Sequence, residues 1–482
     1  LFIMFKLNYL NKNYSFFPIT FLTFVGMLFL FAGCNTAKNS DITFFGGKIK
    51  NPQGKYVYFS KDEKVIDSAK LNKENRFSFQ LDSIKTGLYS FSHGPEFQYL
   101  YLEPQDSLLI YLNTWDFDES LIFSGKGSAE NNYLISLWLQ QEKKKKNFKY
   151  NYRLDEAEFS AIVEKGIQDE LNNYNLFTEG LEEAPSDFFD KLAKAGIFYP
   201  YYFIKERYAY NHMRALKLKK LPTLSNDFYN YRSTVDLNDE SLLNYWAYTP
   251  YLYAYLWNLA YEMNNNDLSK NNISLNYMHV VNDKIQLENF KNELLASSLW
   301  KALSNEYITD NDFKNIQDFF YNNCSNKTIS KEIKHAIYQK DLLKKGDTLP
   351  NLLAVNSNGN EITINKLTKN NTTVIYFWPK NSSQIEMLNK KLVVLEKKYP
   401  NVLFIGIERN KSNKAWNKFI ESRNLSKSNQ FNISKSSKCY TLFEGDMART
   451  IIINNQGNIQ NGYLFFNDKY FEKHLRKLKN QQ

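Results

Sequence analysis

The stretch Thr373-Val-Ile-Tyr-Phe-Trp378 decides the fold of the C-terminal part of this chain. Its near-continuous apolar, β-branched and aromatic residues are typical of a strand buried on both faces of a parallel sheet. Residues 385–399 carry apolar side chains at helical spacing, and Pro400 ends this pattern. Because residues 402–407 form a second apolar run, the three segments predict a right-handed βαβ unit.

The neighbouring segments extend this pattern. Gly346-Asp-Thr-Leu-Pro350 leads into a predicted hairpin over residues 353–364, and Thr450-Ile-Ile-Ile-Asn-Asn-Gln-Gly457 reads as a strand followed by a turn. Together with the βαβ unit, these segments resemble the TlpA-like thioredoxin family. The resemblance implies a thioredoxin-like α/β domain over residues 346–482. We expect its first helix to begin near Ser383 or Ile385 and to pack on the sheet.

The active-site residues of that family are missing from this chain. Family members carry Cys-x-x-Cys after the tryptophan, whereas this chain reads Pro379-Lys-Asn-Ser-Ser-Gln-Ile-Glu386. An ungapped count from Trp378 places the two cysteine positions at Ser382 and Ile385. The family's cis-proline aligns near Ala448, so that loop is expected to run trans. Thiol–disulfide exchange needs a reactive thiolate and a resolving partner, and this helix start has neither.

Serine at position 382 does not restore a nucleophilic site. A serine nucleophile needs an adjacent general base, and the βαβ unit contains no histidine. We expect Asn381 or Ser382 to cap the helix instead. We therefore regard Ser382, Ile385 and Ala448 as vestigial redox-site positions, with no catalytic residue assigned.

The N-terminus predicts a lipid anchor. Basic Lys6 and Lys12 precede an apolar run over residues 16–31, which ends in Leu30-Phe-Ala-Gly-Cys34. This resembles a bacterial lipoprotein signal, which implies removal of residues 1–33 and lipidation of Cys34. An ordinary secretory signal or a transmembrane anchor is the alternative, but the run is shorter than the ~20 residues that span a bilayer. Asn35 follows the cysteine, so we expect an outer-membrane anchor with the protein facing the periplasm.

The other two cysteines are Cys324 and Cys439. Two thiols in an oxidising compartment can pair. They lie in segments that we assign to different domains, without a spacing motif, so two unpaired thiols are the expectation and a structural disulfide is the alternative.

The rest of the chain predicts a multidomain α+β protein. Residues 34–127 contain short apolar runs separated by turns, which indicates an antiparallel β-sandwich. These runs cover residues 42–45, 56–59, 77–81, 87–91, 97–102 and 107–112. Residues 128–345 turn to helical periodicity and predict an all-α region. Gly125-Lys-Gly127 lies between the two regions and is expected to be a turn rather than part of a dinucleotide-binding loop.

An aromatic cluster over residues 245–257 of the helical region has two interpretations. It could form a sugar or peptide platform, but core packing is the commoner use of such a cluster. The five histidines have no metal-ligand spacing, so we expect neither a metal nor a cofactor. The formal charge of +10 is modest for 482 residues and does not argue for a nucleic-acid partner.

Two functions follow from these observations. The first is a lipid-anchored envelope protein whose degenerate thioredoxin-like domain binds or scaffolds an envelope protein or peptide without redox chemistry. The second is an envelope enzyme, either a thiol–disulfide oxidoreductase that uses Cys439 or an unrelated hydrolase in the helical region. Loss of the paired cysteines and of the proline favours the first.

Overall fold

The computed structural model describes residues 42–264, 273–305, 308–379, 382–409, 411–423, 425–434, 449–466 and 471–479. The predicted lipidation site Cys34, the loop position Ala448 and the thiol of Cys439 lie outside these residues. Within the described part of the chain, no helix is both long enough and apolar enough to cross a membrane.

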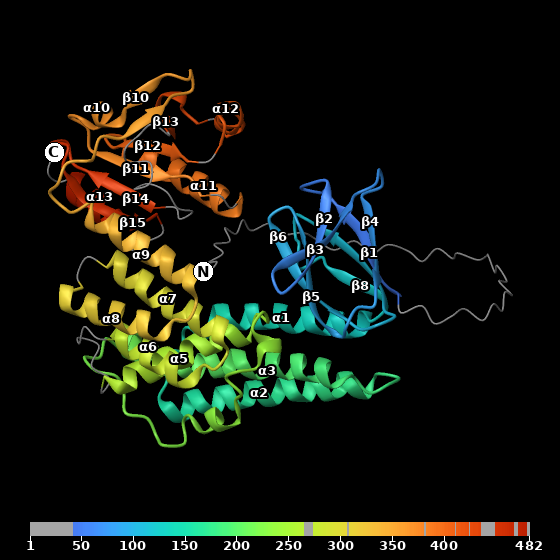
Figure 1. The fold of residues 1–482 in the computed structure, drawn as a ribbon. Coiled ribbons are helices and arrows are strands. Elements are labelled where there is room, and N and C mark those ends of the chain that lie inside the picture. The colour runs from blue at the N-terminus through green and yellow to red at the C-terminus, as the bar shows by residue number, and fades with distance from the viewer. Residues whose placement is uncertain are drawn as a thin grey trace, which may run out of the picture. The chain divides into compact units, whose positions relative to one another are not determined.

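The N-terminal region consists of eight strands in two four-stranded sheets (Figure 1). They are β1 (Ile42–Lys50), β2 (Tyr56–Lys61), β3 (Lys64–Lys70), β4 (Arg76–Asp82), β5 (Gly87–His93), β6 (Glu96–Leu102), β7 (Ser107–Asn113) and β8 (Ile122–Lys126). The strand orders are β4-β1-β7-β8 and β3-β2-β5-β6. The prediction of a purely antiparallel sandwich is wrong at one pair, because β1 and β7 run parallel. A parallel pair requires a crossover, which the intervening strands β2 to β6 provide.

One apolar core lies between the inner faces of these two sheets. Strand β4 shows how the sequence produces it, since Phe77, Phe79 and Leu81 are buried and the residues between them are exposed. This alternation matches the two-residue repeat of a strand with one wet face. Phe45 stacks on Phe79 at 5.9 Å between ring centroids, and Phe59 stacks on Tyr89 at 5.3 Å.

Helix α1 (Ser128–Phe148) begins directly after β8 and holds one edge of each sheet. The Asn131 side chain accepts a hydrogen bond from the Tyr101 N–H at 2.9 Å and donates one to the Tyr101 carbonyl at 2.8 Å. Asn132 makes the same pair of bonds with Phe123, at 3.0 and 2.9 Å. Tyr101 lies on β6 and Phe123 on β8, which are edge strands of the two sheets.

The predicted turn into the helix lies at Gly127 alone, because Gly125 and Lys126 still belong to β8. Gly125 and Gly127 both adopt positive φ angles, 93° and 89°. A Cβ atom at Gly127 would lie 2.7 Å from a carboxylate oxygen of the buried Asp106. Only glycine therefore allows the chain to turn from β8 into α1 at this point.

The middle region is helical, as predicted. After α1 it contains α2 (Glu156–Glu179), α3 (Asp187–Glu206), α4 (Tyr208–Leu216), α5 (Tyr248–Met263), α6 (Ile273–Lys284), α7 (Glu288–Ser304), α8 (Asp310–Asn323) and α9 (Lys327–Asp341), with 3-10 turns η1 (Asn151–Arg153), η2 (Asn230–Thr234) and η3 (Glu240–Leu242). Tyr245, Tyr248 and Tyr251 are all buried in its core. The core interpretation of the aromatic cluster is thus confirmed for these residues.

A buried ion pair stabilises the centre of this helical region. The Glu206 carboxylate, at the end of α3, accepts two hydrogen bonds from the Arg232 guanidinium, at 2.9 and 2.6 Å. It also accepts one from the Tyr231 hydroxyl at 2.8 Å and one from the Asn258 side-chain amide at 2.7 Å. Both oxygens are therefore satisfied, which is the condition for burying a carboxylate.

The C-terminal region contains one seven-stranded sheet with the order β10-β9-β13-β12-β11-β14-β15 (Figure 1). Its elements are β9 (Leu353–Val355), β10 (Glu361–Thr363), α10 (Ile364–Thr368), β11 (Thr373–Phe377), α11 (Ser382–Lys398), β12 (Leu403–Glu408), α12 (Asn413–Ser422), η4 (Lys427–Asn429), β13 (Gln430–Ile433), β14 (Arg449–Ile453), β15 (Ile459–Phe465) and α13 (Phe471–Lys479). The predicted parallel pairing of β11 with β12 and the β9–β10 hairpin are confirmed.

The two faces of this sheet are buried in different clusters. Val374 and Tyr376 of β11 point to one cluster, in which α11 contributes Leu388, Leu392 and Leu395. Ile375 and Phe377 belong to a second cluster on the other face. The expected packing of the first helix on the sheet is confirmed, and β11 is buried on both sides as its continuous apolar sequence predicted.

Candidate functional site

The candidate site lies where β11 and β12 end and α11 begins. The carboxyl ends of parallel strands are the usual place for ligands and reactive groups in open α/β sheets. The Trp378 N–H donates a hydrogen bond to the Ile407 carbonyl at 3.0 Å, so pairing continues one residue beyond β11. Pro379 follows, and Ser382 is the first residue of α11. The structure thus places the helix start at Ser382, slightly earlier than residues 383–385.

A buried chain of three polar side chains fills the space behind this edge. The Trp378 indole Nε1 donates to the Gln430 side-chain oxygen at 3.0 Å, and the Gln430 amide donates to the Tyr376 hydroxyl at 2.8 Å. All three residues are buried, and burial raises the pKa of the Tyr376 hydroxyl. A neutral, hydrogen-bonded chain of this kind fixes side-chain positions but supplies no acid or base near neutral pH.

Gly406 of β12 makes room for this chain. A Cβ atom at position 406 would lie 2.1 Å from the Gln430 side-chain oxygen, 2.7 Å from the Tyr376 hydroxyl and 2.8 Å from the Trp378 Nε1. These separations are well inside van der Waals contact. Any side chain at position 406 would therefore clash with the three hydrogen-bonded side chains, so their arrangement requires glycine there.

Two arginines lie beside the same strand end. The guanidinium carbons of Arg409 and Arg449 lie 5.3 and 5.0 Å from the centre of the Phe377 ring. Arg409 also donates to the Trp378 carbonyl at 3.2 Å, which ties it to the strand end. Both side chains are almost fully buried, at 7% and 2% exposed. Guanidinium groups bind carboxylates and phosphates but do not exchange thiols.

Basic side chains outnumber acidic ones at this edge of the sheet. Burial is the main cause that lowers the pKa of Arg449 to about 10; the nearby Tyr463 raises it, and the charge of Arg409 lowers it further. Next to Arg409, the buried Glu408 carboxylate accepts hydrogen bonds from the Arg409 N–H at 2.9 Å and the Lys411 ammonium at 2.7 Å. Glu408 thus contacts the backbone of Arg409 and the basic side chain of Lys411.

The structure places the sequence-predicted positions as follows. Ser382 begins α11, at the point where the resemblance puts the first cysteine of the redox motif. Ile385 is 6% exposed and packs in the same apolar cluster as Trp378 and Leu388. Ile385 is therefore part of the apolar core. Ala448 and Cys34 lie outside the described residues, so the predictions made for them are not tested.

Cys324 is a free thiol at the C-terminal cap of α8. It is half-buried against the core of the helical region. The expectation that Cys324 is unpaired is confirmed, whereas Cys439 lies outside the described residues. Within those residues, no group of three His, Cys, Asp or Glu side chains could hold a metal ion.

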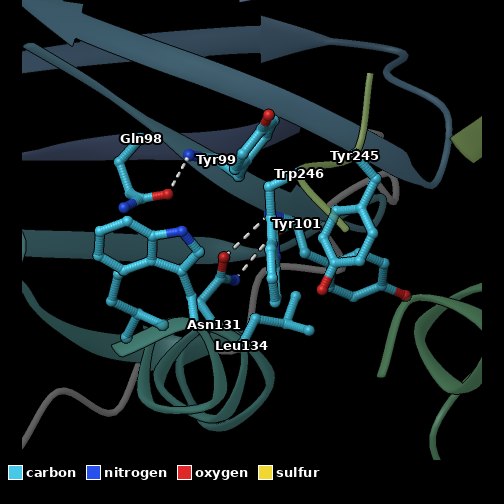
Figure 2. Close-up of a pocket in the computed structure, with 9 residues that line it drawn as sticks. Gln98, Tyr99, Tyr101, Asn131, Leu134, Tyr245 and Trp246 are labelled. Carbon is cyan, nitrogen blue, oxygen red and sulfur yellow. Dashed lines mark hydrogen bonds between the residues drawn. The ribbon is translucent and has the colours of Figure 1, made fainter. Parts of the chain in front are cut away.

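A second candidate site is a small pocket between β6, α1 and the segment before α5. Figure 2 shows Tyr99, Tyr101, Tyr245 and Trp246 around it, with Asn131 bonded to the Tyr101 backbone. The cavity volume is about 20 Å³, which is room for about one water molecule. The pocket is too small for an organic ligand, and its aromatic side chains serve to pack β6 against the helices.

Sequence reasoning missed Arg409, Gln430, Gly406 and Arg449. They come from three separate strands, and only the sheet order brings them together. One local signal existed, because Gly406 interrupts an otherwise bulky apolar strand. An isolated glycine in a strand often marks a close approach of other atoms.

No family model matches this chain, and no curated protein matches it. Among solved structures, a thiol:disulfide interchange protein from Bacteroides sp. is similar over 28% of this chain and 91% of its own, with 16% identity and a TM-score of 0.25. The thioredoxin domain of a thiol-disulfide oxidoreductase from Bacteroides vulgatus is similar over 28% of this chain and 99% of its own, with 18% identity and a TM-score of 0.25.

Proposed function

We propose that this chain is a lipid-anchored protein of the cell envelope whose thioredoxin-like C-terminal region binds a protein or peptide partner without thiol–disulfide exchange. The anchor is the lipid on Cys34, and the membrane is the outer membrane, with the protein facing the periplasm. The sequence Leu30-Phe-Ala-Gly-Cys34 supports the anchor, and Asn35 supports the choice of membrane.

The observation that carries the redox-inactive assignment is the absence of both cysteines at the start of α11. Thiol–disulfide exchange needs an attacking thiolate and a resolving thiol, whereas the two aligned positions hold Ser382 and Ile385, and Ile385 packs in the apolar cluster of Trp378 and Leu388. No cysteine occurs between Cys324 and Cys439. The edge of the sheet carries guanidinium groups and a hydrogen-bonded tryptophan in place of a dithiol.

The test of this function is a disulfide-reduction assay with the purified full-length chain. Reduction of insulin by dithiothreitol is expected to proceed at the same rate with and without the protein, because a single thiol cannot resolve its own mixed disulfide. A thioredoxin serves as the positive control. Turnover by the wild-type chain that disappears in Cys439→Ser would establish the alternative, an oxidoreductase with atypical cysteine usage.

The anchor is tested separately by cell fractionation. Wild-type protein is expected in the outer-membrane fraction, and Cys34→Ala is expected to lose lipidation. Incorporation of labelled palmitate into wild type but not into Cys34→Ala measures the modification directly. A wild-type chain without label would remove the lipid-anchor proposal while leaving the redox result unaffected.

A further inference from the structure

The outer face of the β4-β1-β7-β8 sheet carries a group of exposed apolar side chains. Phe44, Leu109, Tyr111 and Ile122 point outward from β1, β7 and β8 and are 36% to 60% exposed. The strand register brings them together, since Leu109 lies beside Gly46 and Tyr111 lies beside Ile122. A cluster of exposed apolar side chains on one sheet face indicates an interaction surface.

The opposite outer face is a natural comparison. On the β3-β2-β5-β6 sheet, Tyr56, Tyr58 and Phe97 are exposed to a similar degree. The same face continues into Tyr99 and Tyr101, which pack against Tyr245 and Phe189 of the helical region. This second face therefore packs in part against the protein's own helices, whereas Phe44, Leu109, Tyr111 and Ile122 of the first face are left exposed by the described part of the chain.

The short segment between the proposed lipid anchor and β1 indicates which surface the first face can contact. Only residues 35–41 separate the proposed lipidated Cys34 from Ile42, the first residue of β1. Eight residue steps span at most about 29 Å when fully extended. The first strand of this sheet is therefore tethered within that distance of the lipid headgroups.

Basic side chains outnumber acidic ones on this face, where Asp82 at the end of β4 is exposed as well. Lys48 of β1 lies beside Tyr111 on one side and Arg76 on the other, and Lys126 lies beside Ser107 at the other end of the face. Within the described residues, none of these three basic side chains forms an ion pair. Basic side chains that border apolar ones are the combination that binds anionic lipid headgroups.

We propose that this outer face of β4-β1-β7-β8 docks on an anionic phospholipid bilayer. The inference rests on the proposed lipid anchor at Cys34, because the short tether is what selects the bilayer over other surfaces. Docking would place Phe44, Leu109 and Ile122 in the headgroup region, and it would leave the helical and C-terminal regions available for a partner.

The test measures the depth of a spin label in the full-length lipidated chain, reconstituted in vesicles of phosphatidylethanolamine and phosphatidylglycerol. The label is placed at Ser124→Cys on the proposed face or at Ser68→Cys on the opposite sheet, in a Cys324→Ser, Cys439→Ser background. Both serines are exposed. The ratio of collision with oxygen to collision with a soluble nickel chelate is expected to rise severalfold at position 124 and to stay unchanged at position 68.

A matched pair of variants then identifies the surface. Phe44→Ser with Leu109→Ser and Ile122→Ser is expected to abolish the rise at position 124. Tyr56→Ser with Tyr58→Ser and Phe97→Ser removes equally exposed apolar side chains from the other face and is expected to keep it. Thermal unfolding of each variant serves as the control that it is folded. Lys48→Glu with Lys126→Glu is expected to reduce the rise in anionic vesicles without altering the core.

Several results would overturn the inference. A protein that floats with the vesicles but shows equal accessibility at positions 124 and 68 would leave the anchor intact and remove the docking face. Spin–spin broadening at position 124 that persists in detergent micelles would identify a second copy of the chain as the occupant. A chain that fails to float at all would remove the anchor, and the docking proposal with it.

Discussion

The helical region and the C-terminal region each bury an arginine, but they treat the charge in opposite ways. At Arg232, burial alone would lower the pKa, yet the hydrogen bonds and charge of Glu206 outweigh it and raise the pKa. At Arg449, burial prevails and lowers the pKa to about 10, and a second guanidinium, Arg409, adds to the effect. Arg232 is thus buried beside a carboxylate, whereas Arg449 lies beside the Phe377 and Tyr463 rings and near a second cation.

This difference separates a structural cluster from a candidate binding site. The Glu206 carboxylate has four hydrogen-bond donors, from Arg232, Tyr231 and Asn258, and such closed clusters specify the packing of a core. Burying the charge of Arg449 near that of Arg409 costs stability, and proteins commonly retain such costs where function requires them.

The largest expected loss of stability comes from removing the Glu206 carboxylate from its hydrogen-bonded cluster. Glu206→Gln removes the buried carboxylate beside the Arg232 guanidinium and is expected to lower the free energy of unfolding by about 3–5 kcal/mol. Arg449→Met removes a charge that burial already disfavours and is expected to cost less than about 1 kcal/mol. Denaturant titration of both variants measures the contrast directly.

Glu262→Gln is the matched control for the first variant. Glu262 contacts the same guanidinium at 3.1 Å, but its side chain is 40% exposed, so its loss is expected to cost at most about 1 kcal/mol. Equal losses from Glu206→Gln and Arg449→Met would show that the two regions treat their buried charges alike.

The β-rich region contains an intermediate case in Asp106, a buried carboxylate that accepts a hydrogen bond from the Glu103 N–H at 2.8 Å. Burial is the main cause that raises its pKa from 3.8 to about 6. The folded state therefore binds more protons than the unfolded state between these values, and stability is expected to fall as the pH rises from about 4 to about 6. The loss is about 3 kcal/mol at most.

Asp106→Asn is expected to flatten this pH dependence, measured as the unfolding free energy at intervals from pH 4 to 7. Asp118, whose pKa burial also raises to about 6, contributes a similar slope, so Asp106→Asn with Asp118→Asn should remove most of it. An Asp106→Asn variant whose stability follows the same pH dependence as the wild type would contradict the burial argument.

The smallest of the three effects is expected at the polar chain beside the arginines. Gly406→Ala places a methyl group within 2.1 Å of the Gln430 side chain and is expected to destabilise the protein by about 1–3 kcal/mol through overpacking. Gly54→Ala is the control, because its nearest neighbour, the His93 ring, is 3.9 Å away. A loss at Gly406 no larger than at Gly54 would mean that the polar chain rearranges freely.

Much of the fold could be predicted from periodicity alone. Strands with one buried face, such as β4, alternate visibly, and β11 is apolar throughout because both its faces are covered. Strand β3 was missed because nearly all its residues are exposed and it has no alternation. Strand β13 was missed because polar Gln430 and Asn432 are buried in it by hydrogen bonds that a sequence pattern does not show.

The candidate site was less predictable, for a different reason. The absence of cysteines after Trp378 is a local property of the sequence and could be read from it directly. The meeting of Arg409, Gln430 and Arg449 depends on the order of strands in the sheet, which no local pattern encodes. The core role of Ile385 became evident only when its apolar neighbours were placed around it.

The paired asparagines of α1 have a consequence for aggregation. Edge strands expose unpaired N–H and C=O groups that recruit strands from other molecules. Asn131 and Asn132 occupy such groups on β6 and β8 with side-chain amides, as a neighbouring strand would. A fragment cut at Gly127 would keep every strand of the β-rich region yet lose both protecting groups. The helix therefore caps one edge strand of each sheet, and it follows the last of these strands directly in the chain.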